Sequence, residues 1–152
     1  MTKLSHWISA LVSAACLTAA AQTSYPLLLD GQERAVWAFT LDRRELTMTG
    51  ICIVRQGAEG VAGTVVNEFG VKAFDFTVRK GRLKLRNMAQ PINRWYIRRT
   101  LRSDLRCLVA PQPRSVGRRR TLTLSLPDSI VLLNKRFDIT YRFQRINIDT
   151  EQ

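Results

Sequence analysis

Histidine is almost absent from the sequence, which contains one in 152 residues, His6 near the amino terminus. If export removes that terminus, the remaining chain has no imidazole for Ser-His or Cys-His catalysis or for metal binding. The sequence also has no G-x-S-x-G, G-x-x-x-x-G-K or C-x-x-C motif, and its acidic residues are scattered rather than paired. These absences predict a protein that is not an enzyme and that needs no metal and no cofactor.

The sequence also has no apolar run long enough to span a membrane. A membrane-spanning helix needs about 20 apolar residues, and the longest uncharged apolar stretch, residues 7–21, is shorter than that. This uncharged stretch follows Lys3 and ends in alanines, which is typical of a secretory signal peptide. Cleavage after Ala21 would give a soluble periplasmic protein. Cleavage before Cys16 would give a lipoprotein, because Val12–Cys16 resembles a bacterial lipobox. We expect an exported protein of the bacterial cell envelope, either an outer-membrane lipoprotein facing the periplasm or a soluble periplasmic protein.

Cysteine is also scarce, and apart from Cys16 the sequence has only Cys52 and Cys107. In an oxidising compartment these two can pair, and a disulfide that closes so long a loop would add about 4 kcal/mol of stability. Two isolated buried thiols are an equal alternative. Two cysteines without histidine cannot complete a zinc site.

The rest of the chain has the composition of a folded domain. The hydrophobic share of the full sequence, 45%, and its five prolines argue against a disordered basic tail. The length predicts a single domain over residues 22–152.

Apolar and polar residues alternate along most of this domain, which predicts β-strands. Turn signals such as Gln56–Gly60 and Lys80-Gly81 separate the alternating segments. The first five strands should form a meander, because short turns join them. The expected strands are residues 37–41, 46–54, 61–67, 71–78, 82–86, 121–126, 130–133 and 136–143.

One segment, residues 92–109, has helical periodicity instead. Its apolar residues Ile97, Leu101, Leu105 and Leu108 recur at spacings of four, four and three and share one face. One helix and eight strands predict a mainly β (α+β) fold. We expect a curved antiparallel sheet, or unclosed β-barrel, of about eight strands covered by one amphipathic helix.

Two short features have both a structural and a functional interpretation. Asn67–Gly70 predicts a hairpin turn, or alternatively the mouth of a cavity with Glu68 facing a partner. Asp75 alternates out of phase with Phe74 and Phe76, so we expect it to face outward rather than to act as an acid.

Arginine is concentrated between residues 94 and 120, in a chain of net charge +12. Such a charge first suggests nucleic acid, but an exported protein meets little of it. An anionic membrane surface fits better, and a solvated helix face is the alternative. The residues expected to contact an anionic surface are Trp95, Arg98, Arg99, Arg102 and Arg106.

Large apolar side chains mark the inner face of the expected sheet. They form either a filled core or the wall of a partly open cavity, because one helix has to cover eight strands. The candidate cavity residues are Trp37, Phe39, Met48, Phe74, Phe76, Phe137, Ile139 and Tyr141.

Several of these features resemble the lipoprotein-localisation carriers and receptors of Gram-negative envelopes, the LolA/LolB-like family. The resemblance spans roughly residues 34–90 and includes the signal segment with Cys16. Its motifs are the strand Gly50–Arg55, the turn Phe69-Gly70 and the strand Arg82–Leu85. The resemblance implies an unclosed antiparallel barrel, covered by helical segments, whose apolar cavity holds the acyl chains of lipoproteins.

These patterns lead to two hypotheses. The first is an envelope lipid- or lipoprotein-binding protein that holds acyl chains between sheet and helix and faces an anionic membrane, with no nucleic-acid partner. The second is an accessory outer-membrane lipoprotein that binds another protein and has a filled core. Residues 23–33 look extended, where the family usually begins its mature domain with a helix.

Overall fold

The computed structural model describes residues 26–29, 31–109 and 116–148. The expected signal peptide and Cys16 lie outside the described residues.

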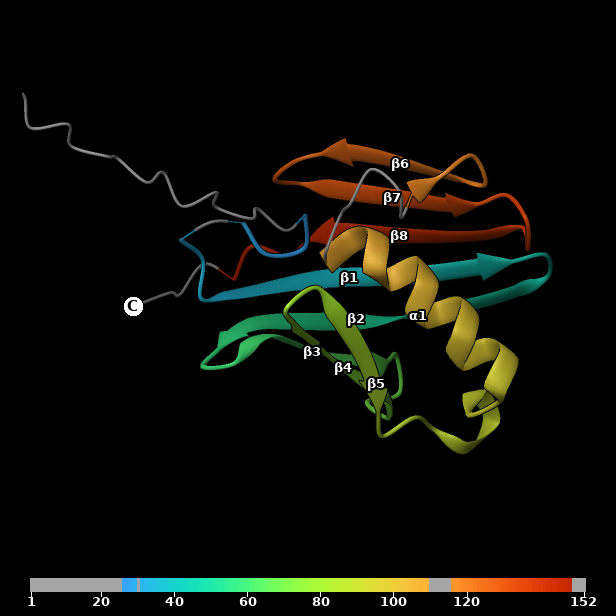
Figure 1. The fold of residues 1–152 in the computed structure, drawn as a ribbon, viewed down its shortest axis with the longest axis horizontal. Helices are drawn as coiled ribbons and strands as arrows, with labels where there is room; N and C mark the ends of the chain where they lie inside the picture. The colour runs from blue at the N-terminus through green and yellow to red at the C-terminus, as the bar shows by residue number, and fades with distance from the viewer. Residues whose placement is uncertain (1–25, 30, 110–115, 149–152) are drawn as a thin grey trace, which may run out of the picture.

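Eight antiparallel strands form one sheet in the order β5-β4-β3-β2-β1-β8-β7-β6 (Figure 1). The first five strands are a meander, as expected, and the last three form a second meander that joins the first where β8 pairs with β1. The sheet does not close, so β5 and β6 are its two edges. The strands are β1 (Arg34–Arg43), β2 (Leu46–Gly57), β3 (Gly60–Asn67), β4 (Lys72–Arg79), β5 (Arg82–Arg86), β6 (Arg120–Ser125), β7 (Ser129–Asn134) and β8 (Ile139–Arg145).

A single helix among the described residues, α1 (Trp95–Val109), lies across one face of this sheet (Figure 1). A short 3-10 turn, η1 (Gln90–Ile92), precedes it. Leu101, Leu105 and Leu108 are buried against the sheet, as their spacing predicted. The fold class is therefore confirmed: a curved, unclosed antiparallel sheet of eight strands with one amphipathic helix.

Close packing on the inner face depends on a small residue in β3. Gly63 pairs with Phe76 of β4, and a Cβ atom at Gly63 would overlap the Phe76 ring. Phe76 is completely buried, so its ring has little room to move. The glycine allows a large aromatic ring to lie flat on the neighbouring strand.

The amino-terminal segment of the described chain contributes to the core. Leu27 and Leu28 are buried, and the Trp37 indole N–H donates a hydrogen bond to the Leu27 carbonyl oxygen at 2.9 Å. Residues 26–29 are not helical. The segment packs on the inner face beside Trp37, so it fills space that an open cavity would leave empty.

Several expected strand and helix boundaries were wrong. The helix begins at Trp95 instead of residue 92. The last strand begins at Ile139, because Asp138 has a φ of 53° and the Asn134 side chain accepts hydrogen bonds from the backbone of the following turn. Phe137 therefore lies in the β7–β8 turn. β1 extends to Arg43, which moves the first turn to residues 44 and 45.

Cys52 and Cys107 are both buried thiols and do not form a disulfide. The alternative of two separate thiols is therefore the one observed. Burial raises the pKa of Cys52 to about 12, because a thiolate there would be stripped of water. The Cys107 thiol donates to the Ser103 carbonyl oxygen within α1 at 3.6 Å.

We predict that Gly63→Ala destabilises the protein by about 1–3 kcal/mol, because the added methyl group forces the Phe76 ring out of its place. Urea denaturation measures the change. Ala62→Ser, on the outward side of the same strand, is the control and should shift stability by less than about 0.5 kcal/mol. Equal stability of Gly63→Ala and the wild type would show that the core tolerates the extra volume.

Candidate functional site

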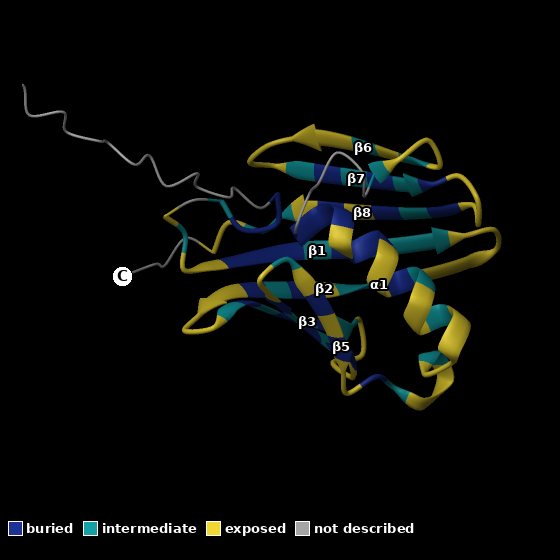
Figure 2. Ribbon diagram, in the orientation of Figure 1, coloured by how far each residue is buried: buried dark blue, intermediate teal, exposed yellow. Residues whose placement is uncertain are grey.

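The eight residues predicted to line a cavity fall into two groups. Met48 is half-buried, and Phe137 lies exposed in the β7–β8 turn, outside the core. The other six residues have exposed fractions of 8% or less, so no water-sized space adjoins most of their surface. Figure 2 shows that buried residues are concentrated along the central strands and on one side of α1. These six buried residues are Trp37, Phe39, Phe74, Phe76, Ile139 and Tyr141.

A buried carboxylate, which the sequence analysis did not single out, joins α1 to the sheet. Asp104 of α1 has no exposed surface. Its Oδ1 accepts from Arg120 Nε at 2.7 Å, and its Oδ2 accepts from the Tyr141 hydroxyl at 2.7 Å. Asn134 Nδ2 donates to both oxygens, at 2.9 and 3.0 Å. Three strands, β6, β7 and β8, thus bind one helix through a single side chain.

The charge of Asp104 is balanced by Arg120, whose side chain is 19% exposed. Arg120 also donates from Nη2 to the Ser103 hydroxyl at 2.7 Å. Burial and the adjacent Asp104 carboxylate raise the pKa of Tyr141 well above 10.0, so the hydroxyl stays protonated as a donor. The spacing in the sequence could have indicated this buried carboxylate. Residue 104 follows Leu101 by three and precedes Leu108 by four, so it lies on the apolar face of the helix.

Most of the large exposed apolar side chains among the described residues lie at one end of the molecule. The β1–β2, β3–β4 and β7–β8 turns lie at the same end of their strands by antiparallel register, with the β3–β4 turn set back by about four residues because Asn67 pairs with Gly50 of β2. The start of α1 lies beside the β7–β8 turn, because Trp95 and Phe137 line one cleft. We call this the turn end, and in Figure 1 its β1–β2 and β7–β8 turns lie at the right. Its exposed apolar residues are Leu46, Phe69, Val71, Trp95, Tyr96 and Phe137.

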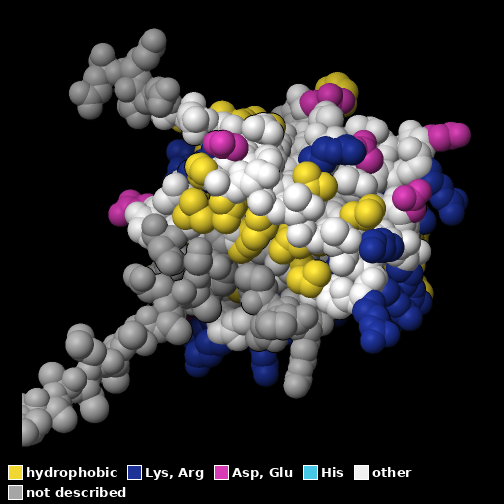
Figure 3. Space-filling view, turned by 90° about the horizontal axis from the view of Figure 1, so that it is seen from above, with side chains coloured by type: hydrophobic (Ala, Val, Ile, Leu, Met, Phe, Trp, Pro, Cys, Tyr) yellow, Lys and Arg dark blue, Asp and Glu magenta, His cyan; other side chains and the backbone are white. Residues whose placement is uncertain are grey.

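The turn end is also rich in basic residues. Figure 3 shows Lys and Arg side chains gathered toward the end at which α1 begins. Exposed bases outnumber exposed acids there, and Phe69 and Trp95 project among them with exposed fractions of 81% and 74%. The exposed charged residues are Arg43, Arg44, Lys72, Arg94, Arg99, Lys135 and Arg136, against Glu45, Glu68 and Asp138.

The five residues predicted to contact an anionic surface are all exposed. At 100° per residue, these five side chains fall within an arc of about 100° on the outer side of α1. Arg98 and Arg102 face the edge strand β5, where Arg98 Nη2 donates to the Leu85 carbonyl oxygen at 3.5 Å. Trp95 and Arg99 face the β7–β8 turn instead. Arg106 lies in the last turn of the helix.

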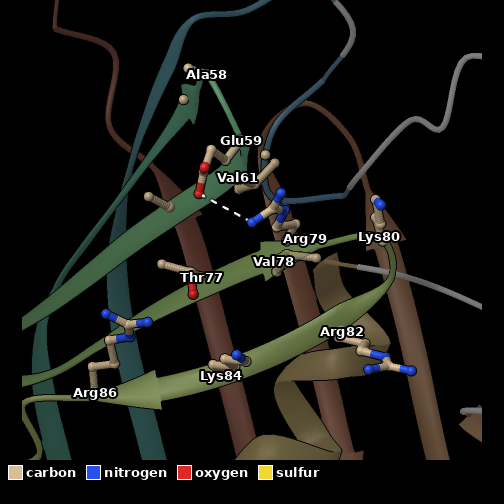
Figure 4. A pocket seen from close by; sticks show the side chains of 13 residues that line it. Ala58, Glu59, Val61, Thr77, Val78, Arg79, Lys80, Arg82, Lys84 and Arg86 are labelled. Carbon is tan, nitrogen blue, oxygen red and sulfur yellow. Dashed lines mark ion pairs between the residues drawn. The ribbon is translucent and has the colours of Figure 1, made fainter.

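A basic cleft, larger than the one that Trp95 and Phe137 line, lies at the opposite end of the sheet, between the β2–β3 and β4–β5 turns (Figure 4). Its volume is about 800 Å³, and we call it the β5 cleft. Arg82, Lys84 and Arg86 extend along one side from strand β5, while Arg79 forms an ion pair with Glu59 at 3.6 Å.

The Asn67–Gly70 turn and Asp75, for which the sequence left a structural and a functional interpretation open, are both held by hydrogen bonds within the protein. In the Asn67–Gly70 turn, Asn67 Oδ1 accepts from the backbone of Phe69 and Val71, and Glu68 accepts from Thr49 at 2.8 Å. Asp75 accepts from Asn87, Thr64 and Lys72. Partial burial alone would raise the pKa of Asp75, but these bonds and the charge of Lys72 hold it below its usual value.

Comparison with models of known protein families and with curated proteins finds no match to this chain. Within the described residues, no group of three or more His, Cys, Asp or Glu side chains is placed to hold a metal ion. No helix of the described part is long and apolar enough to cross a membrane.

We predict that Asp104→Asn destabilises the protein by about 3–5 kcal/mol, because Arg120 then loses the carboxylate that balances its partly buried charge. Tyr141→Phe should cost about 1.5–3 kcal/mol, the value of a hydrogen bond to a charged group. Both are measured by urea denaturation at neutral pH. A loss below about 1 kcal/mol for Asp104→Asn would show that the carboxylate does not hold the helix.

The same network predicts a fall in stability at alkaline pH. The folded state keeps the Tyr141 proton above the ordinary tyrosine pKa of 10.0, whereas the unfolded chain releases it there. Stability should therefore decrease as the pH rises above about 10. The decrease should be shallower in Tyr141→Phe, and identical slopes in the two proteins would contradict the raised pKa.

Proposed function

We propose that this protein is a lipid-binding protein of the bacterial cell envelope that contacts anionic lipid through its turn end and the basic side of α1. The observation that carries the proposal is the gathering of six large exposed apolar side chains at one end, among basic residues. Tryptophan and tyrosine favour the membrane interface, and each Lys or Arg near an anionic surface adds about 1 kcal/mol.

The exported location belongs to the same proposal. A lipid on Cys16 would hold the domain at a membrane, since acyl chains contribute about 0.8 kcal/mol per buried CH₂ group. The turn end would then meet lipid at high local concentration, so moderate affinity is sufficient.

A more specific version of the proposal is that the protein binds acyl chains inside the half-barrel, between sheet and helix. Leu27, Leu28 and the apolar face of α1 pack on the inner face, where a chain would have to lie. A bound acyl chain therefore requires α1 or the Leu27 segment to move away from the sheet. The resemblance to lipoprotein-localisation proteins supports this form.

A second function has its own support. The near-complete burial of Trp37, Phe39, Phe74 and Phe76 favours an accessory lipoprotein that has a filled core and binds another protein. Native mass spectrometry of the protein from cells, with titration of a fluorescent fatty acid, separates the two. Co-purified lipid or saturable fatty-acid binding supports the acyl-chain form. Their joint absence supports the filled core.

We predict that Trp95→Ser and Phe69→Ser each weaken binding to phosphatidylglycerol-containing vesicles by about tenfold, because each removes a large apolar side chain worth about 1.5 kcal/mol on burial. Vesicle co-sedimentation measures the change. Ile148→Ser removes an exposed apolar residue beyond the end of β8, away from the turn end, and should leave binding unchanged. Equal losses in all three variants would contradict a contact at the turn end.

We also predict that Cys16→Ser moves the protein from the membrane fraction to the soluble periplasmic fraction. The change removes the atom that carries the lipid, whereas the described domain stays intact. Cell fractionation with immunoblotting measures the distribution. The same fractionation pattern in both proteins would favour cleavage after Ala21.

A further inference from the structure

A second cleft, at the turn end, brings four arginines together from separate parts of the chain. It lies between the first two turns of α1, the start of β6 and the β7–β8 turn. Its volume of about 500 Å³ falls in the range of about 300–1,000 Å³ that is usual for small-molecule sites. We call it the arginine cleft. Its lining includes Arg99, Arg119, Arg120 and Arg136, with Trp95, Tyr96 and Phe137.

The cleft has no acidic residue among the described residues that line it. Asp104 is completely buried behind Arg120 and already balances one positive charge, and Asp138, which follows Phe137 in the β7–β8 turn, is the exposed acid next to the lining in sequence. The other three guanidinium groups give the cleft a surplus of positive charge. Like charges that line one cleft repel one another, and an anion in the cleft relieves the repulsion.

Hydrogen bonds position the walls of the cleft before any ligand arrives. Asn134 donates to Asp104 and accepts from the backbone of Arg136, so the buried carboxylate indirectly sets the β7–β8 turn. The Lys135 N–H donates to the Arg119 carbonyl oxygen at 2.8 Å, which joins the same turn to the start of β6. Arg120 is fixed between Asp104 and Ser103. A prearranged site loses little entropy on binding.

The side chains of the cleft indicate the class of ligand. Planar guanidinium groups match the oxygens of a phosphate, and such charge-assisted hydrogen bonds are among the strongest in proteins. Trp95 and Tyr96 pack edge to face at 5.9 Å and provide exposed apolar surface next to the arginines. Arg136 lies 5.1 Å from the centre of the Phe137 ring. These features suit a phosphate group that is attached to an apolar or ring-bearing moiety.

The β5 cleft lacks this arrangement, although it is also basic. Arg82, Lys84 and Arg86 alternate along a single strand and are exposed to solvent (Figure 4). Glu59 neutralises Arg79, and none of the described lining residues is aromatic. The β5 cleft therefore provides a control region with similar charge and a different geometry.

We propose that the arginine cleft is a binding site for a phosphate group, carried either by a lipid headgroup or by a soluble phosphate ester. The lipid source rests on the proposed function, whereas the site itself does not. Phosphate recognition at this cleft would give the turn end a preference among anionic lipids that bulk charge alone does not provide.

The test is isothermal titration calorimetry, in which inorganic phosphate is titrated into the processed protein purified from cells, at constant ionic strength. The wild type should show saturable one-to-one binding. The double variant Arg99→Gln/Arg136→Gln should bind at least about tenfold more weakly, because two charge-assisted contacts are lost. Both side chains are exposed, so the fold should persist, which circular dichroism and thermal melting check.

The matched control is Arg82→Gln/Lys84→Gln in the β5 cleft, which removes the same charge. It should change phosphate affinity by no more than about twofold. Absence of saturable binding in the wild type would overturn the proposal. So would an equal loss of affinity in the two double variants, which would indicate bulk charge only.

Vesicle binding distinguishes the two sources of phosphate. If the lipid headgroup occupies the cleft, inorganic phosphate should compete with phosphatidylglycerol vesicles, and Arg99→Gln/Arg136→Gln should bind them weakly. If phosphate saturates the cleft while vesicle binding is unaffected, the site is supported with a soluble ester as its ligand. A wild type that binds phosphate but no vesicles would refute the proposed lipid contact and leave the phosphate site standing.

Discussion

The carboxylate of Asp104 is the contact on which the arrangement of helix and sheet depends. A buried charge is costly unless it is paired and fully hydrogen-bonded, and Asp104 has Arg120, Asn134 and Tyr141 as donors. Apolar packing alone would let α1 slide or rotate over the inner face, because the contacts of leucine side chains are not directional. The donors to Asp104 come from three adjacent strands, so they fix the helix in one position. The polar network supplies specificity, and the surrounding core supplies most of the favourable free energy.

The position of the helix determines what the surface offers. With Asp104 fixed, the outer side of α1 turns its arginines to solvent, and its first turn places Trp95 and Tyr96 beside the β7–β8 turn. The same network orders that turn through Asn134. The Asp104 network therefore helps to place Trp95, Tyr96 and the arginine cleft at the turn end, while strand register brings Leu46, Phe69 and Val71 to the same end. We propose an anionic lipid surface as the partner, because its chemistry matches the exposed apolar side chains, the excess of basic residues and the arginine cleft.

Much of the fold followed from the sequence, because alternation in the strands and the repeat of Leu101, Leu105 and Leu108 depend on local neighbours. The first meander and the exposed arginines of α1 were predicted for the same reason. The start of the last strand was predicted too early, because Phe137 continues the apolar alternation of that strand. In the structure, the Asn134 side chain and the left-handed backbone of Asp138 hold Phe137 in a turn before the strand begins. The role of Asp104 needed tertiary information, since its partners lie 16, 30 and 37 residues away. The arginine cleft likewise joins residues that only the fold brings together.

The depth of Trp95 in a bilayer tests the lipid contact most directly. Tryptophan fluorescence would be measured with phosphatidylglycerol vesicles whose acyl chains are brominated near the headgroup. Trp37 is completely buried, so it should contribute little to quenching, whereas Trp95 is largely exposed at the turn end. The account predicts strong quenching in the wild type that is lost in Trp95→Phe. Equal quenching in both proteins would contradict insertion of the turn end into lipid.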